Sequence, residues 1–228
     1  MKQVFDDEDT EAMILVDASN AFNCLNRQTT LLNCGSVCPA LSHILINTYR
    51  NNSQLFVDGQ CILSKEGTTQ GDPLAMAMYA IGTQPLIHRL DGIAKQVRYA
   101  DDSAAGSKLV RLRWWDLLVE IGPQYGYFLN GSKTHVLAKP HHVEAAKEIF
   151  KGTGIVISTE GERYLGGAIG TSSFIRCYVK RKVECWVNEM EKLSKIAETQ
   201  PHVAYAAYTH GLSHKWNYLF RVTDWEEN

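Results

Sequence analysis

The pattern of apolar and polar positions predicts a domain of mixed α and β structure. Residues 12–16, Ala-Met-Ile-Leu-Val, form a continuous apolar run that is long enough for a buried central strand and short for a helix. Residues 97–106 alternate like two strands around Asp101-Asp102, which predicts a β-hairpin with the acidic pair at its turn. A second hairpin is predicted over residues 54–63, because Asp58-Gly59 favours a two-residue turn.

Helical segments are predicted on both sides of that second hairpin. Residues 24–50 carry apolar faces that indicate two helices, with Pro39 at the first position of the second one. Asp72 and Pro73 are typical of an N-cap and of the first helical position, so a third helix is expected to begin there. Pro85 is expected to end or kink this third helix.

The last quarter of the chain predicts one long amphipathic helix. Its apolar positions follow each other at alternating spacings of four and three residues: Val179, Val183, Trp186, Met190, Leu193 and Ala197. Its outer face carries basic side chains, among them Arg176, Lys180, Arg181 and Lys182. Such a face is typical of a solvated helix and also suits the phosphate backbone of a nucleic acid. The change in character suggests a domain boundary near residue 172.

Composition excludes several classes of protein. The chain has 45% hydrophobic and 21% charged residues, which is ordinary for a globular protein, and its net charge of −2 argues against binding through bulk charge. No apolar run approaches the ~18 residues that a membrane span needs. The start of the chain is acidic, with no secretory signal, so an intracellular protein without membrane association is expected. The six cysteines lack the paired spacing of zinc ligands.

Three acidic positions are candidates for chemistry. Asp17 follows the apolar run at 12–16, and a charged residue at the end of a buried strand either points into a cleft or serves as a turn residue. Asp101 and Asp102 are either solvated turn formers or ligands of a divalent cation, since hard cations prefer carboxylate oxygens. The Gly-bearing segment 66–74 either feeds a capped helix or receives an anion or nucleotide at the helix start.

Taken together, these segments resemble a known family. The segments, in chain order, are Asp17 to Phe22, Thr69-Gln-Gly-Asp-Pro-Leu74, Tyr99-Ala-Asp-Asp102, Gly126-Tyr-Phe-Leu-Asn-Gly-Ser-Lys-Thr134 and Tyr164-Leu-Gly-Gly167. This order resembles the palm of reverse transcriptases, most closely those of non-LTR retrotransposons. The acidic excess near the start predicts a solvated tail at 1–11, and the resemblance implies a reverse transcriptase palm at 12–172 and a helical thumb-like segment at 173–228. The expected fold is an α+β palm with a central antiparallel sheet and helices on one face.

The resemblance also implies an active site. Asp17 and Asp101 would bind two Mg²⁺ ions, or Mn²⁺ in their place, with help from the Ala18 carbonyl and support from Asp102. Two divalent ions can clamp the attacking and leaving oxygens of a nucleotide transfer. Lys133 would assist the pyrophosphate leaving group as an acid or a charge stabiliser.

The implied substrates are an RNA template, a DNA primer and deoxynucleotides. Phe22 stands at the steric-gate position, where its ring would clash with a ribose 2′-hydroxyl, and Gln70 and Gly71 would lie against the incoming nucleotide. The primer grip would be formed by Tyr164, Leu165, Gly166 and Gly167. The basic helix face, Arg176, Lys180, Arg181 and Lys182, would follow the duplex backbone.

One departure from the family keeps alternatives open. The family's fingers should precede the first motif, yet 16 residues precede Asp17, so the fingers are expected to be largely missing and the chain to be a fragment of a retroelement protein. The first hypothesis is an RNA-directed DNA polymerase fragment. The second is an inactive palm remnant that binds nucleic acid or a partner, and the third is an RNA-dependent RNA polymerase.

Overall fold

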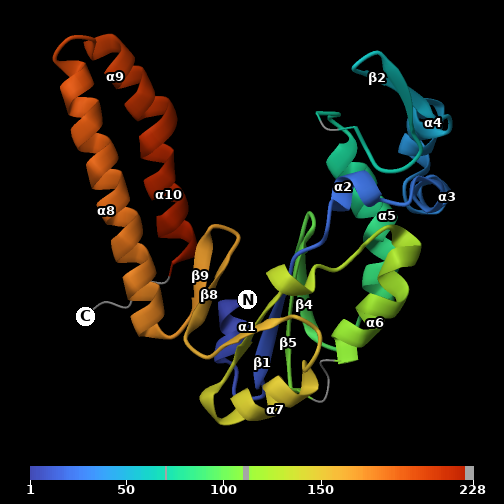
Figure 1. The fold of residues 1–228 in the computed structure, drawn as a ribbon, viewed down its shortest axis with the longest axis horizontal. Coiled ribbons are helices and arrows are strands. Elements are labelled where there is room, and N and C mark those ends of the chain that lie inside the picture. Colours follow the sequence, from blue (N-terminus) through green and yellow to red (C-terminus); the bar gives the residue numbers. More distant parts are fainter. Residues whose placement is uncertain (70, 110–112, 224–228) are drawn as a thin grey trace. The chain divides into compact units, whose positions relative to one another are not determined.

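The computed structural model describes residues 1–69, 71–109 and 113–223 (Figure 1). The chain divides into two compact units, one formed by Gln3–Ile157 and one by the described residues from Ser158 onward. Each unit has a hydrophobic core of its own. No helix among the described residues is both long enough and apolar enough to cross a membrane. The predicted division into a tail (1–11), a palm (12–172) and a thumb-like segment (173–228) assigns functional roles, and it stays a prediction.

The elements alternate between helices and strands in the first unit and are mostly helical in the second. Up to residue 158 they are α1 (Lys2–Asp6), β1 (Ala12–Val16), α2 (Ala21–Cys24), α3 (Arg27–Val37), α4 (Pro39–Tyr49), β2 (Ser53–Val57), β3 (Gln60–Ser64), α5 (Ala75–Arg89), β4 (Lys95–Tyr99), β5 (Asp102–Ser107), α6 (Arg113–Ile121), η2 (Gly122–Tyr125), η3 (Gly131–Lys133), β6 (His135–Ala138), η4 (Pro140–His142), α7 (Val143–Ile149) and β7 (Val156–Ser158). After it come β8 (Gly161–Tyr164), β9 (Gly167–Gly170), α8 (Ser172–Ala197), α9 (Pro201–Ala207), η5 (Tyr208–Leu212) and α10 (Ser213–Val222).

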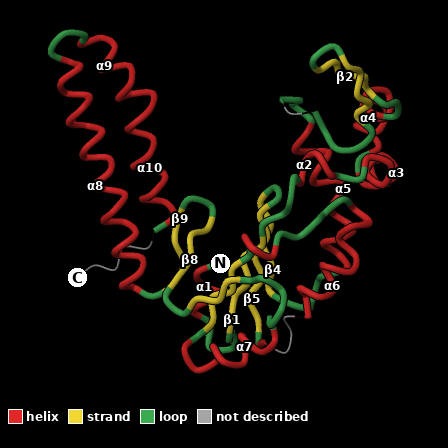
Figure 2. The backbone as a smooth tube through the Cα atoms, viewed as in Figure 1, coloured by secondary structure: helices red, strands yellow, loops and turns green. Residues whose placement is uncertain are grey.

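The first unit is built on a five-stranded sheet in the order β4-β5-β1-β6-β7. β1 is antiparallel to both β5 and β6, and β4 is antiparallel to β5, so the α+β class and the antiparallel centre are confirmed. Figure 2 shows β1, β4 and β5 side by side. Every residue of β1 is buried, because the strand lies at the centre of the sheet and both of its faces are covered.

The two faces of the sheet carry different contacts. On one face, Ile14 and Ala105 join the main core with Met78 of α5 and Trp114 of α6. On the other face Met13 is also fully buried, and helix α1 lies against it: a Cβ added at Gly106, the β5 partner of Met13, would come 2.6 Å from Val4 Cγ1. The prediction of helices on one face is therefore wrong for α1. The sequence signal was weak because α1 has only five residues.

The acidic start of the chain has more order than a solvated tail. Residues 2–6 form α1, and Asp7 then forms an ion pair with Lys95 at the start of β4. Asp9 forms a second pair with Lys108, at 3.6 Å between Oδ1 and Nζ. Both pairs lie at the surface, where solvent screens them, so they add little to stability.

Local turn and capping signals predicted most of the elements. The hairpin of β2 and β3 turns at Asp58 and Gly59, both with positive φ, as the sequence predicts. Pro39 begins α4 as expected. Helix α5, however, begins at Ala75, because the Asp72 carboxylate accepts a hydrogen bond from the Leu74 amide and closes a turn before the helix. It also continues through Pro85 to Arg89, so the helix does not end at the proline.

In the second unit a helical pair packs on a short hairpin. Trp186 of α8 lies against Trp216 of α10, with ring centroids 4.8 Å apart. Tyr178 and Leu219 complete this small core. The predicted amphipathic helix is thus present as α8, although Met190, which the spacing places on the apolar face, is 38% exposed.

A buried arginine fixes the loop between β3 and α5. Arg27 is 5% exposed, and its guanidinium donates to the carbonyls of Ser64 (2.9 Å), Glu66 (2.8 Å) and Gly67 (3.1 Å) and to Ser64 Oγ (3.1 Å). The same group lies 5.4 Å from the centre of the Tyr49 ring. The start of α3 therefore holds the chain that leads to residues 69–74.

We expect Arg27→Lys to lower the free energy of unfolding by about 2–4 kcal/mol, because an ammonium cannot replace the planar fork and leaves buried carbonyls unpaired. Urea unfolding followed by tryptophan fluorescence measures this change. Arg50→Lys, at an exposed position after α4, is the control and should cost almost nothing. A loss below about 1 kcal/mol for Arg27→Lys would contradict the proposed role of the guanidinium.

Candidate active site

Asp17 stands at the carboxyl end of β1, and backbone hydrogen bonds hold its position. Its carbonyl accepts from the Asn130 amide at 3.0 Å, and the Ser19 amide donates to the Phe128 carbonyl at 2.7 Å. These two bonds flank the bridge between Ala18 and Leu129. In this antiparallel pattern the Ala18 N–H and C=O point away from Leu129, and therefore toward the β5 side of β1.

The second acidic segment is the turn between β4 and β5. The predicted hairpin is present, but its last paired residues are Tyr99 and Asp102, so the two-residue turn is formed by Ala100 and Asp101 rather than by Asp101 and Asp102. Ala100 has φ +53°, a left-handed conformation that costs a non-glycine residue about 1–2 kcal/mol. Such an outlier persists where the surroundings impose it, which is common at functional sites.

Strand register brings the two segments together. Val16 pairs with Ser103, so one further residue places Asp17 beside Asp102. Side chains alternate along a strand, and both carboxylates therefore lie on the same face of the sheet. All three carboxylates, those of Asp17, Asp101 and Asp102, thus belong to two adjacent strand ends.

The electrostatics agree with this convergence. Burial raises the pKa of Asp102, and the negative charges of Asp101 and Asp17 raise it further. Lys133, from η3, places its Nζ 3.8 Å from Asp17 Oδ2. The lysine side chain is 68% exposed and the aspartate 36%, so solvent screens this pair and it fixes little geometry.

The donor set suits a hard cation without forming a complete cage. Among the described residues, no three acidic, histidine or cysteine side chains come close enough together to hold a metal ion by themselves. The site nevertheless offers several carboxylates and the Ala18 carbonyl. Oxygen donors of this kind are the ones that Mg²⁺ binds, together with waters and substrate phosphates. The predicted metal ligands stay a prediction.

The aromatic residue after Asp17 has a rigid support. Phe22 lies on α2, half-buried, and its ring stacks on Tyr79 of α5 with centroids 4.7 Å apart. The Phe22 carbonyl accepts from the Thr68 amide at 2.9 Å, which ties the loop before α5 to the same segment. Gly71 has φ +90° and continues this loop, whereas the predicted contact residue Gln70 lies outside the described residues.

The remaining predicted residues belong to the second unit. Leu165 and Gly166 form the turn between β8 and β9, with φ +48° and +75°. Tyr178 Oη donates to the Gly166 carbonyl at 2.7 Å, and Tyr218 Oη donates to the Leu165 carbonyl. The predicted grip residues Tyr164 and Gly167 are the last pair of that hairpin.

The basic face of α8 is present in the second unit. Arg176, Lys180 and Arg181 are exposed. Lys182 is half-buried, with its Nζ 5.7 Å from the centre of the Tyr178 ring. All four side chains stand on α8, but Lys182 lies against Tyr178 of the small core, and the predicted contact with a nucleic acid stays a prediction.

Sequence reasoning missed the residues beneath the acidic turn. Tyr127 and Ser103 are buried, and their hydroxyls lie 2.8 Å apart. The Arg98 guanidinium lies 5.2 Å from the Tyr127 ring centre and 5.8 Å from that of Trp114, and burial lowers the pKa of this arginine. The signal that could have found them is Arg98 itself, a charge within a strand that leads to the acidic pair.

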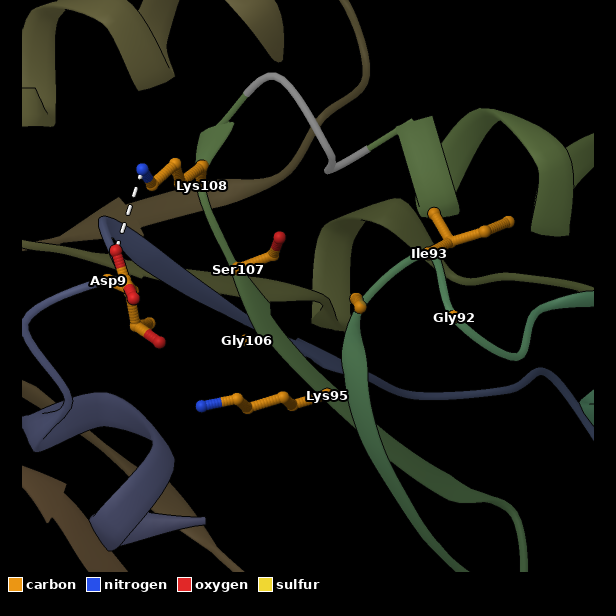
Figure 3. A pocket seen from close by; sticks show the side chains of 9 residues that line it. Asp9, Gly92, Ile93, Lys95, Gly106, Ser107 and Lys108 are labelled. Atoms are coloured by element: carbon orange, nitrogen blue, oxygen red, sulfur yellow. Dashed lines mark ion pairs between the residues drawn. The ribbon is translucent and has the colours of Figure 1, made fainter.

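A pocket of about 400 Å³ lies elsewhere in the first unit, and Figure 3 shows side chains that line it. It lies at the open end of the β4–β5 hairpin, opposite the acidic turn, and its lining includes Asp9, Lys95 and Lys108. None of the predicted site residues lines it. This pocket is therefore distinct from the candidate active site.

Comparison with known proteins finds similarity among solved structures. No protein-family model matches the sequence. No curated protein matches it. Among solved structures, apo telomerase from Candida tropicalis, truncated from its C-terminal domain, is similar with a TM-score of 0.47 and 14% identity. Telomerase from Candida albicans, in complex with a fragment of telomeric RNA, has a TM-score of 0.45 and 13% identity. Each match covers 71% of this chain, but 34% and 29% of those chains, so this chain spans about a third of their length.

We expect Asp102→Asn to raise the melting temperature at pH 7. Because the pKa of Asp102 is raised on folding, its charge destabilises the folded state at any pH where the carboxylate is ionised. The gain should vanish as the pH falls below the ordinary carboxyl pKa of about 4, where the wild-type residue is neutral too. Thermal melts between pH 3.5 and 7 test this, with exposed Asp58→Asn as the control. A lower melting temperature for Asp102→Asn at pH 7 would contradict it.

Proposed function

We propose that the chain is an RNA-directed DNA polymerase domain that adds deoxynucleotides to a primer 3′-hydroxyl. The observation that carries this proposal is the convergence of Asp17 with Asp101 and Asp102 at adjacent strand ends. The order of the sequence segments supports the same reaction, since it resembles that of reverse transcriptases, most closely those of non-LTR retrotransposons. In this proposal the protein is part of a retroelement.

The carboxylates and one carbonyl would hold two Mg²⁺ ions. Asp17 and Asp101 would be the principal ligands, the Ala18 carbonyl would add an oxygen, and Asp102 would support the pair. These ions would supply the Lewis acidity that an in-line phosphoryl transfer requires on its attacking and leaving oxygens. Mn²⁺ prefers the same carboxylate and water ligands and would serve as a substitute.

Lys133 would act on the leaving group. Its ammonium is exposed and only loosely paired with Asp17, so it can turn toward a substrate phosphate without breaking a buried contact. In the substrate complex, the ammonium would donate a hydrogen bond or a proton to the departing pyrophosphate. The acidic turn and η3 thus contribute different groups to the same transfer.

Phe22 would select the sugar. The stack with Tyr79 limits how far the Phe22 ring can retreat, so a 2′-hydroxyl at this position would meet a fixed surface. A rigid wall discriminates better than a mobile one, because relief of the clash would cost the stacking contact. The gate therefore favours deoxynucleotides.

The second unit would hold the primer and duplex. The carbonyls of the Leu165–Gly166 turn are fixed by Tyr178 and Tyr218, which gives the proposed primer grip a defined shape. The basic face of α8, with Arg176, Lys180, Arg181 and Lys182, would contact the phosphates of an RNA template paired with DNA. Such contacts carry affinity without sequence preference.

An inactive palm that binds nucleic acid or a partner is the second candidate. One observation favours it: within the described residues, no cluster of three ligating side chains is ready to hold a metal ion. A polymerase that recruits its metals together with the nucleotide would show the same feature. Primer extension separates the two candidates.

We expect the chain to extend a DNA primer on an RNA template with Mg²⁺ and deoxynucleotides, and Asp101→Asn to reduce the rate by roughly a hundredfold or more, because a charged metal ligand is lost. Asp58→Asn removes the same charge at an exposed turn and should extend normally. Absence of extension by well-folded wild-type protein would favour the inactive palm. Equal extension rates for Asp101→Asn and Asp58→Asn would show that Asp101 is not a metal ligand in the reaction.

We expect Phe22→Val to lower the preference for deoxynucleotides over ribonucleotides by about tenfold or more, since the smaller side chain admits a 2′-hydroxyl. The measurement is the ratio of kcat/KM for the two kinds of nucleotide. Tyr79→Phe keeps the aromatic stack and should retain the wild-type ratio. A wild-type protein that prefers ribonucleotides would instead indicate RNA synthesis.

A further inference from the structure

A buried tyrosine touches the backbone of the acidic turn. Tyr127 is 1% exposed, and its hydroxyl donates to the Asp101 carbonyl at 3.0 Å. The Ser103 hydroxyl lies 2.8 Å from the same Oη and is left to donate to it, since a phenol has a single proton. The turn carbonyl is therefore held by a group that lies 26 residues away in the sequence.

The tyrosine itself is fixed on three sides. Its amide donates to the Gly122 carbonyl at 3.0 Å, and a Cβ added at Gly122 would come 2.6 Å from the Tyr127 carbonyl oxygen. The Arg98 guanidinium lies 5.2 Å from the ring centre, within the range of a cation–π contact. The phenol is thus a rigid support rather than a mobile side chain.

The turn needs such a support. Tyr99 and Asp102 are the last pair of the β4–β5 ladder, so the ladder does not extend to Asp101. Ala100 holds a left-handed conformation that alanine disfavours, so without an external hydrogen bond the turn would relax toward other conformations. The direction of the two adjacent carboxylates depends on which conformation the turn holds.

We propose that Tyr127 is a positioning residue, whose hydroxyl fixes the Asp101 carbonyl and thereby the direction in which the Asp101 and Asp102 carboxylates face a divalent cation. The cation itself belongs to the proposed function, whereas the support of the turn does not depend on it. Tyr127 touches neither the cation nor a substrate and acts through the turn. Tyrosine is required here because phenylalanine would fill the same space without the hydrogen bond.

The test compares the full chain with its Tyr127→Phe and Tyr125→Phe variants. Tyr125 is also buried, 7% exposed, and the described residues give its hydroxyl no hydrogen bond to the turn, so it controls for the general loss of a buried phenol. Two quantities are measured: amide hydrogen exchange of residues 99–103 by NMR, and Mn²⁺ affinity by water-proton relaxation. The second is a readout that a merely structural role would leave unchanged.

Loss of one hydrogen bond predicts roughly three- to tenfold faster exchange in the turn and a similar loss of Mn²⁺ affinity for Tyr127→Phe, with Tyr125→Phe like the wild type. Equal exchange and equal affinity in the two variants would overturn the proposal. If the wild type binds no Mn²⁺ even with a deoxynucleotide present, the proposed function fails, and the exchange rates then decide the positioning role. Ser103→Ala, which removes the donor to the phenol, should loosen the turn less and serves if Tyr127→Phe does not fold.

Discussion

The register between β1 and β5 is the constraint on which the candidate site depends. A slip of one residue would move Asp17 to the opposite face of the sheet from Asp102, since side chains alternate along a strand. Such a slip is opposed because all five residues of β1 are buried, so that another register would draw a charged flanking residue, Glu11 or Asp17, into the buried span. The burial of the apolar run at 12–16 therefore fixes the position of the Asp17 carboxylate, which follows directly after it.

Bringing three carboxylates to one place opposes folding, and the surrounding backbone offsets this cost. The pKa of Asp102 is raised by burial first and then by the charges of Asp101 and Asp17, and the exposed Lys133 relieves little of this repulsion. The opposing contribution comes from uncharged contacts: the Asn130 amide on the Asp17 carbonyl and the Tyr127 hydroxyl on the Asp101 carbonyl. Because these bonds hold main-chain atoms, the carboxylate oxygens stay available to a ligand. Stability and binding capacity thus use different atoms of the same residues.

Features set by neighbouring residues could be predicted from the sequence, and features set by distant ones could not. Both predicted hairpins are present, and the turn at Asp58-Gly59 follows from local chemistry, whereas the second turn is formed by Ala100 and Asp101 rather than by the acidic pair. The start of α5 was misplaced because Asp72 closes a turn before the helix, a choice between two local hydrogen bonds that propensity does not decide. The contacts of Arg27 with residues 64–67 and of Tyr127 with Asp101 span 37 to 40 and 26 residues, so no local pattern announces them.

The same device recurs in each unit at the turns that carry the candidate functional segments. Ala100 and Leu165 are both non-glycine residues with left-handed backbone, and each stands in a two-residue hairpin turn. In both turns a tyrosine from another segment donates to a turn carbonyl, Tyr127 to Asp101 and Tyr218 to Leu165. In a turn that only connects two strands, a glycine at the left-handed position would remove the strain without loss of packing. Strain that is retained and supported from outside is what preorganisation of a site requires, since a rigid turn spends less free energy on ordering when its ligand binds.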